Sequence, residues 1–184
     1  MIRGIENEPT CILLYSDGSL LTDQTGRRRV GASYVALRQN HLLFGRRIAM
    51  SPRAEVFDAE MAGLSWAARD ATAYLSEHPD LQIRHLYFFA DNTSAISTIF
   101  EVKTSTAQGY SRSFRELTTA FLDAHPENTV TVEWTPGHEG ITGNEMADEL
   151  AKDAANTAPP HRLASRAAAR REARERAQDR RAHV

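Results

Sequence analysis

The chain has 184 residues, of which 41% are apolar, so its length and composition favour one folded domain followed by an extension. No apolar run approaches the ~20 residues that a membrane-spanning helix requires, and the first ten residues lack the apolar segment of a secretory signal. Cys11 is the only cysteine, which excludes an intrachain disulfide and favours a nuclear or cytoplasmic protein. Because Cys11 lies in an apolar run, it is predicted to be buried.

The formal net charge of −2 conceals an asymmetry along the chain. From Arg162 onward, eight arginines stand against three acidic residues, whereas the first 161 residues carry 14 basic and 21 acidic side chains. An acidic body with a basic tail favours a polyanionic partner. We therefore predict a folded domain over residues 1–157 and an Arg/Ala-rich tail over 158–184, which is partly helical because Arg171 and Glu175 are spaced i,i+4.

Three strands with tight connections are predicted first, over residues 10–17, 30–37 and 41–50. Residues 39–40 form the bend between the second and third of them. Ser51-Pro52 then opens a helix, with the serine as its cap and the proline in its first turn. Apolar residues keep helical spacing until this helix ends near residues 78–79.

The second half of the chain begins with a strand over 83–91, whose apolar residues run without alternation, as in a strand covered on both faces. The elements that follow are a short helix from Asn92, a helix over 110–124, a strand over 128–136 and a helix from Thr142 to about Ala155. A strand reached through a helix is normally parallel to a strand before it. The order βββαβααβα therefore predicts an α/β fold with a mixed five-stranded sheet and helices on both faces.

Two aspartates are predicted to end neighbouring strands. Asp17 ends the first strand and shares a face with Leu13 and Tyr15, and Asp91 ends the strand after the long helix. If these strands are parallel neighbours, both carboxylates lie at the edge where open α/β sheets carry their active sites. Each also has a structural explanation, because Asp17 can start a turn before Gly18 and Asp91 can cap the next helix.

Two further carboxylates lie on helices. Glu60 falls within the apolar stripe of its helix, where a charge is unfavourable unless it is paired. Asp148 flanks the packed face of the last helix. The alternatives are a boundary glutamate that reaches solvent for Glu60 and an exposed ion pair with Lys152 for Asp148.

Together the four carboxylates would repel one another, because like charges a few ångströms apart shift pKa values or require a cation. No basic side chain is predicted to neutralise them. Oxygen ligands without cysteine or clustered histidine favour Mg²⁺ or Mn²⁺ over zinc. Two such ions ~3.5–4 Å apart can activate a water and stabilise a leaving oxygen in phosphodiester cleavage.

Four segments then resemble those of a known family, namely "YSDGS", "FDAEMAGLSWAARDA", "FADN" and "WTPGHEGITGNEMADELAK". Together they resemble type I ribonuclease H over about residues 10–155, and in particular the RNase H domain of fungal non-LTR retrotransposon polyproteins. The last segment is highly specific, and the other three gain weight from their order. The resemblance implies an RNase H-like fold and an endonuclease that hydrolyses the RNA strand of RNA/DNA hybrids with two Mg²⁺ ions, for which Mn²⁺ can substitute.

The family's acidic positions fall on Asp17, Glu60, Asp91 and Asp148, and its mobile-loop histidine falls on His138. The resemblance implies that Asp17 bridges both metals and that Glu60 and Asp91 hold the ion nearer the leaving group. Asp148 would hold the ion that activates water. His138 would assist product release or proton traffic.

The chain departs from cellular bacterial members of the family in its nucleic-acid contacts. Their basic helix and protruding loop are reduced to "VKTSTAQGY", Val56 and Phe57 replace their asparagines, and no N-terminal hybrid-binding domain is expected. Contacts are therefore predicted for Gly18, Ser19 and Asn92, with backbone groups of the first two near RNA 2′-hydroxyls. In the tail, four arginines recur every four residues and form a stripe if the tail is helical: Arg162, Arg166, Arg170 and Arg174. This stripe either contacts phosphates or is a solvated linker.

The implied partners are an RNA/DNA hybrid and a reverse transcriptase within a larger polyprotein. Two other functions are alternatives: another nuclease of the same fold, and a domesticated, non-catalytic nucleic-acid-binding module. The first would not be expected to carry the GNExAD-type ending. The second would be expected to have lost an acidic position, and none is lost.

Overall fold

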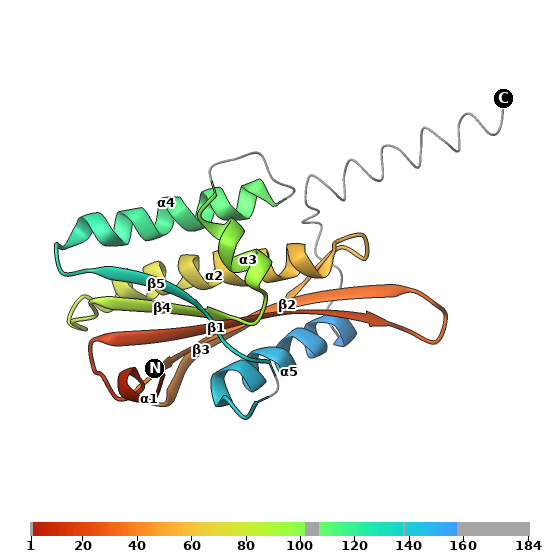
Figure 1. The fold of residues 1–184 in the computed structure, drawn as a ribbon, viewed down its shortest axis with the longest axis horizontal. Coiled ribbons are helices and arrows are strands. Elements are labelled where there is room, and N and C mark those ends of the chain that lie inside the picture. The colour runs from red at the N-terminus through yellow and green to blue at the C-terminus, as the bar shows by residue number, and fades with distance from the viewer. Residues whose placement is uncertain (1, 102–106, 138, 158–184) are drawn as a thin grey trace.

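The computed structural model describes residues 2–101, 107–137 and 139–157 (Figure 1). The predicted tail over 158–184, with its four regularly spaced arginines, lies outside the described residues, and so does His138. The boundary between the folded domain and the tail therefore stays a prediction.

Five strands form one mixed sheet, as predicted. They are β1 (Cys11–Thr22), β2 (Arg28–Arg38), β3 (His41–Ala49), β4 (His85–Ala90) and β5 (Thr129–Trp134). Their order across the sheet is β3-β2-β1-β4-β5, in which β2 is antiparallel to β1 and β3, whereas β4 runs parallel to β1 and β5. The bend between β2 and β3 falls at Gln39 and Asn40, where both residues have positive φ as a tight hairpin requires.

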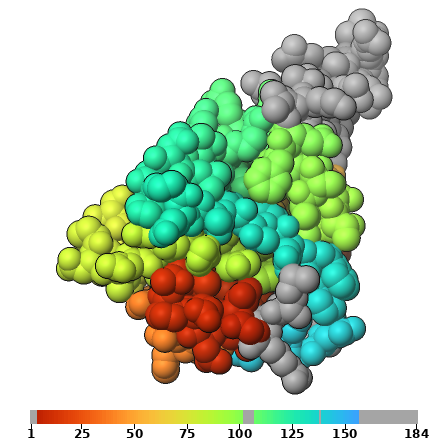
Figure 2. Space-filling view, turned by 60° about the vertical axis from the view of Figure 1, so that its left-hand side comes forward, coloured from red at the N-terminus to blue at the C-terminus, as the bar shows by residue number. Residues whose placement is uncertain are grey.

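Helices cover both faces of the sheet (Figure 1). The helices on one face are α2 (Val56–Glu77), α3 (Thr93–Ile99) and α4 (Gln108–Ala124), and the opposite face carries α5 (Thr142–Thr157). One short helix was not predicted, α1 (Ile2–Ile5). Figure 2 shows red atoms of the N-terminal segment at the surface. Among the described residues, no helix combines the length and apolarity needed to cross a bilayer.

Alternation along β1 supplies side chains to both layers of the core. Ile12 and Leu14 belong to the larger apolar cluster, which includes residues of α2, α3 and α4. Leu13 and Tyr15 belong to the smaller cluster, which includes residues of α5. Cys11 is buried, as predicted. Because packed helices lie on both sides, Ser16 and Asp17, which follow Tyr15 in β1, are buried.

The predicted end of the first strand at Asp17 is wrong. β1 continues to Thr22 because residues 18–22 keep pairing with β2, from Gly18 opposite Ala32 to Thr22 opposite Arg28. The turn follows instead at Asp23. Its Oδ1 atom accepts hydrogen bonds from the backbone amides of Thr25 and Arg27, at 3.0 Å each. A carboxylate that was expected to terminate a strand is thus held within one.

The predicted helix start at Ser51-Pro52 is also wrong. These residues form a turn in which the Ala54 amide donates to the Ser51 carbonyl at 2.9 Å. α2 begins at Val56, after the Glu55 amide has donated to Asp58 Oδ2 at 3.0 Å. The side-chain bond to Asp58 performs the capping that the sequence had assigned to the serine.

The close approach of α2 to the sheet depends on Gly63. A Cβ atom at this position would lie 2.7 Å from the Ser33 carbonyl oxygen and 3.0 Å from the Ser16 Cβ atom. The absence of a side chain therefore sets how near α2, and with it Glu60, lies to β1.

Gly63→Ala is expected to lower the free energy of unfolding by roughly 1–3 kcal/mol, although alanine favours helix, because the added methyl group overpacks against backbone. Urea denaturation monitored by circular dichroism measures the change. Gly109→Ala on α4 is the matched control, because a Cβ there meets nothing within 4 Å. Equal effects of the two substitutions would contradict this account of α2 packing.

Candidate active site

Two neighbouring parallel strands bring Asp17 and Asp91 together. The paired residues of β1 and β4 end with Ser16 opposite Ala90, and each aspartate is the next residue in its chain segment. The two carboxylates therefore lie at the carboxyl end of β4, as the sequence predicts, even though β1 itself continues past this point. Open α/β sheets commonly carry their active sites at this edge.

The third carboxylate, Glu60, reaches this edge from the start of α2. Its helix lies against β1 at Gly18, where a Cβ atom would be 2.9 Å from the Glu60 amide nitrogen and 3.0 Å from the Ala59 Cβ atom. Glu60 is 2% exposed, so the predicted alternative of a boundary glutamate that reaches solvent is wrong. One Glu60 carboxylate oxygen, Oε2, is buried without a hydrogen-bond partner among the described residues.

These three carboxylates form one compact cluster. Each of Asp17, Glu60 and Asp91 offers an oxygen atom that lies within 4.8 Å of those of the other two. Asp17 is 6% exposed and Asp91 is half-buried. Buried polar atoms normally have hydrogen-bond partners. The unpaired Oε2 atom of Glu60 is therefore available to bind a cation within this acidic cluster.

Burial and repulsion act on this cluster together. The pKa of Asp17 is raised to about 6, first by loss of hydration and then by the negative charges of Asp91 and Asp148. The pKa of Glu60 is raised well above its ordinary value, again first by burial and then by the charges of Asp17 and Asp91. A divalent cation among these groups would reverse the effect of the repulsion.

Asp148 approaches the site from α5 but lies outside the compact cluster. Lys152 Nζ donates to Asp148 Oδ2 at 2.6 Å, one helical turn away. The expectation that no basic side chain would reach the four acids is therefore wrong for Asp148, and the ion pair considered as its alternative is present. The pair is exposed and local, so it is weak and can be exchanged for another cation.

All four carboxylates nevertheless line one pocket of about 330 Å³. The residues around this pocket are Asp17, Gly18, Val56, Glu60, Asp91, Asn92, Asn144 and Asp148. None of these lining residues is basic. Every candidate ligand atom in the pocket is a hard oxygen, which fits Mg²⁺ or Mn²⁺ and does not favour zinc.

The structure adds Asn144 to the site, which the sequence analysis did not single out. Asn144 is 3% exposed, and its buried Oδ1 has no hydrogen-bond partner among the described residues. The spacing in the sequence could have identified Asn144, because it precedes Asp148 by four residues and therefore lies on the same side of α5.

The predicted nucleic-acid contacts divide between the pocket and its surroundings. Gly18 and Asn92 line the pocket, and Asn92 Oδ1 also caps α3 by accepting from the Ala95 amide at 3.0 Å. Ser19 is buried beside them in β1. Their role in binding nucleic acid stays a prediction, as do the roles of His138 and of the tail residues Arg162, Arg166, Arg170 and Arg174, which lie outside the described residues.

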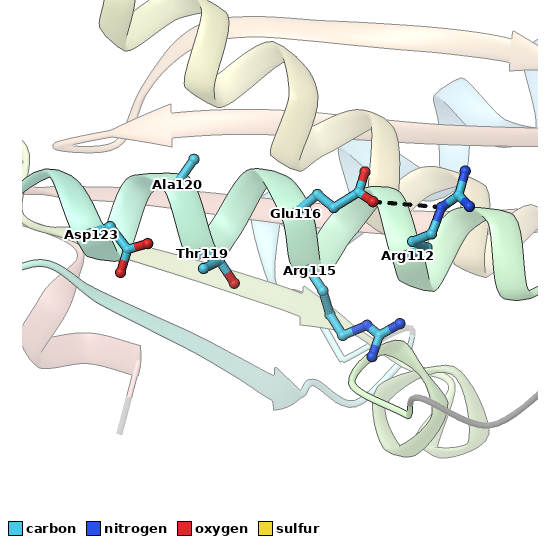
Figure 3. A pocket seen from close by; sticks show the side chains of 6 residues that line it. All are labelled: Arg112, Arg115, Glu116, Thr119, Ala120 and Asp123. Carbon is cyan, nitrogen blue, oxygen red and sulfur yellow. Dashed lines mark ion pairs between the residues drawn. The ribbon is translucent and has the colours of Figure 1, made fainter.

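A larger hollow of about 520 Å³ runs along α4 (Figure 3). Its lining residues all come from this one helix and carry both signs of charge, with Arg112 Nε 3.6 Å from Glu116 Oε1. Figure 3 shows these side chains spread along the helix without a common point of convergence. The smaller acidic pocket, which gathers residues from four segments, is therefore the candidate active site.

Comparison with protein families identifies the family to which the chain belongs. The model of the RNase H family matches residues 9–156, which includes every residue of the acidic pocket. No curated protein matches the chain in sequence.

Solved structures of similar fold include RNase H domains from viruses, bacteria and archaea. A foamy viral protease–reverse transcriptase in complex with RNA/DNA hybrid has a TM-score of 0.62 at 13% identity, covering 83% of this chain and 21% of that one. The N-terminal RNase H domain of a Mycobacterium tuberculosis protein, solved as a maltose-binding-protein fusion, has a TM-score of 0.57 at 18% identity, covering 82% and 99%. RNase H1 from the archaeon Halobacterium salinarum has a TM-score of 0.54 at 17% identity, covering 78% and 96%.

In the presence of a chelator, Asp17→Asn is expected to raise the free energy of unfolding at pH 8 by roughly 1–3 kcal/mol. This magnitude follows from the pKa of the Asp17 carboxyl, which is about 6 in the folded chain and 3.8 as its ordinary value. Below pH 3.8 the carboxyl of Asp17 is protonated in both the folded and the unfolded chain and does not lower the free energy of unfolding. As the pH rises through 6, ionisation of this buried carboxyl lowers the free energy of unfolding. The difference between the two proteins should therefore vanish near pH 4.

Urea denaturation of both proteins between pH 4 and pH 8 measures this difference. Asp123→Asn, on the exposed surface of α4, is the control and should change stability little at either pH. An Asp17→Asn protein that is less stable than the original at pH 8 would contradict the proposed electrostatic strain.

Proposed function

Since this chain belongs to the RNase H family, we propose that it hydrolyses the RNA strand of RNA/DNA hybrids with the help of two divalent metal ions. The observation that carries this proposal is the convergence of three carboxylates within 4.8 Å in a pocket whose lining residues include no basic side chain. The expected products carry 3′-hydroxyl and 5′-phosphate ends.

Asp17, Glu60 and Asp91 are the proposed ligands of the first ion. Asp17 is also the carboxylate best suited to be shared with a second ion, because it interacts electrostatically with both Asp91 and Asp148. Asp148 would exchange its ion pair with Lys152 for that second ion. Mg²⁺ is the proposed metal, with Mn²⁺ as a substitute, because the ligands are oxygen atoms.

When bound, such ions supply an activated water and stabilise the charge on the leaving oxygen. The chain itself contributes the fixed geometry, because Asp17 is held within β1 and Glu60 is held by the packing of α2 against Gly18. His138 is proposed to move protons or assist product release. Its neighbour Gly137 lies against Asp91, where a Cβ atom would be 2.8 Å from Oδ2.

Selection of RNA is proposed to rest on the wall of the pocket at Gly18 and Asn92. Gly18 lines the pocket, and Asn92 carries an amide that can donate to a sugar or phosphate oxygen. Backbone groups near Gly18 and Ser19 are the proposed contacts to 2′-hydroxyls, which distinguish RNA from DNA.

A linkage to a reverse transcriptase is a further part of the proposal. The chain spans about a fifth of two foamy viral protease–reverse transcriptase chains that it resembles in fold. Together with the motif resemblance to retrotransposon polyproteins, this supports a role beside a reverse transcriptase that produces hybrids, in the nucleus or the cytoplasm.

The first alternative is another nuclease of the same fold, which would cut double-stranded DNA or RNA as readily as a hybrid. The second is a domesticated, non-catalytic binding module, which would bind nucleic acid without binding metal at Asp17. Calorimetric titration with Mn²⁺ separates the second alternative from an enzyme, because a non-catalytic module should show no binding of two ions.

The chain is expected to cleave an RNA/DNA hybrid in Mg²⁺ or Mn²⁺ and to leave double-stranded DNA intact. Asp17→Asn and Glu60→Gln should each lower the rate by at least about a hundredfold, since each removes a charged metal ligand while conserving shape. Labelled-strand gels measure the products. Asp123→Asn should retain full activity, and equal cleavage of DNA and hybrid would favour the other nuclease class.

Neutralising the tail stripe should weaken hybrid binding in a salt-dependent way. If Arg162, Arg166, Arg170 and Arg174 each contact a phosphate, replacing all four by glutamine should make the plot of log affinity against log salt shallower by about 3–4. Fluorescence anisotropy in Ca²⁺, without turnover, gives this slope. An unchanged slope would show that the stripe is a solvated linker.

A further inference from the structure

Trp134 is the last residue of β5, which is an edge strand of the sheet. This large aromatic residue is 52% exposed, although β5 lies directly beside the buried strand β4. Its indole nitrogen Nε1 donates to the backbone carbonyl of Asp91 at 3.0 Å. The ring is therefore oriented by a hydrogen bond to one of the three clustered carboxylate residues, rather than by burial.

Asp91 lies just beyond the last paired residues of the sheet. The ladder between β4 and β5 ends with Ala90 opposite Trp134, so Asp91 directly follows the residue that pairs with Trp134. It is also the least buried of the three clustered acids. Repulsion from Asp17 and Glu60 favours a conformation in which the Asp91 carboxylate turns out towards solvent.

The end of β5 and the residues that follow it make one contact with Ala90 and two with Asp91. The Thr135 amide donates to the Ala90 carbonyl at 3.0 Å, immediately before Asp91. The Trp134 indole holds the Asp91 carbonyl, and Gly137 lies so close to the Asp91 carboxylate that a Cβ atom would be 2.8 Å from Oδ2. The Asp91 backbone is thus hydrogen-bonded to the last residue of β5, and its carboxylate lies against Gly137.

We propose that Trp134 is a positioning residue, which holds Asp91 in the cluster through the indole hydrogen bond and so prepares the metal site before substrate binds. This inference rests on the proposed metal-dependent function. It assigns to Trp134 a role that acts through Asp91 and does not require contact with nucleic acid. Groups that orient a metal ligand in this way commonly change metal affinity about tenfold or more.

Trp134→Phe tests the proposal, because phenylalanine keeps an aromatic ring but has no N–H to donate. Calorimetric titration of the full chain with Mn²⁺, without nucleic acid, should show about tenfold weaker binding of the ion held by Asp91. Cleavage should be impaired at low Mg²⁺ and recover at high Mg²⁺, with little change in KM for the hybrid. Thermal unfolding in chelator verifies that the variant is folded.

Trp66→Phe is the matched control, because the chain has only two tryptophans. Trp66 lies on α2 beneath the guanidinium groups of Arg46 and Arg69, at 5.1 and 4.6 Å from the ring centroid, and does not line the acidic pocket. Its replacement should leave Mn²⁺ affinity unchanged. Gly137→Ala is a second test, because the added methyl group must displace the Asp91 carboxylate and should also weaken Mn²⁺ binding.

The outcomes are distinguishable. If the unaltered chain binds no Mn²⁺, the proposed function fails. If it binds Mn²⁺ and Trp134→Phe binds it within twofold as tightly, the positioning role is overturned. If Trp134→Phe keeps its metal affinity but has a raised KM for the hybrid, the exposed ring serves as a stacking surface for nucleic acid instead, and the positioning role is likewise overturned.

Discussion

Repulsion among three enclosed carboxylates is the constraint on which the site depends. Asp17 and Glu60 are removed from water by a strand covered on both faces and by a helix that approaches through Gly18 and Gly63. The apolar clusters on the two sides of the sheet provide the stability that keeps these groups together. The fold thus holds an arrangement that is unfavourable in itself and that a divalent cation makes favourable.

The fourth carboxylate is held differently, and this difference has a mechanistic meaning. Asp148 is paired with Lys152 on its own helix, at the surface, where an ion pair contributes little and exchanges readily. Asp17 and Glu60, by contrast, are fixed by backbone packing. Under the proposed function, one metal position would be prepared by the fold, and the other would form when a ligand or substrate draws Asp148 from its partner.

The sequence revealed the sheet, its helices and the acidic residues, because apolar periodicity and residue order follow directly from burial. It misplaced Asp17 at the end of a strand, since pairing of Gly18 to Thr22 with β2 depends on a partner strand that local composition does not reveal. It missed Asn144 because an uncharged amide is common in helix first turns, and only the pocket shows its unpaired oxygen. The hydrogen bond from Trp134 to Asp91 could not be predicted either, because it depends on the strand order that places β5 beside β4.

The most direct test of the central claim is anomalous diffraction from crystals of the chain grown with Mn²⁺. The account predicts a strong anomalous peak among the carboxylates of Asp17, Glu60 and Asp91, with a second peak beside Asp148 when a hybrid is bound. Well-ordered crystals at saturating Mn²⁺ with no peak at these residues, or with a basic side chain lying among them, would contradict the account.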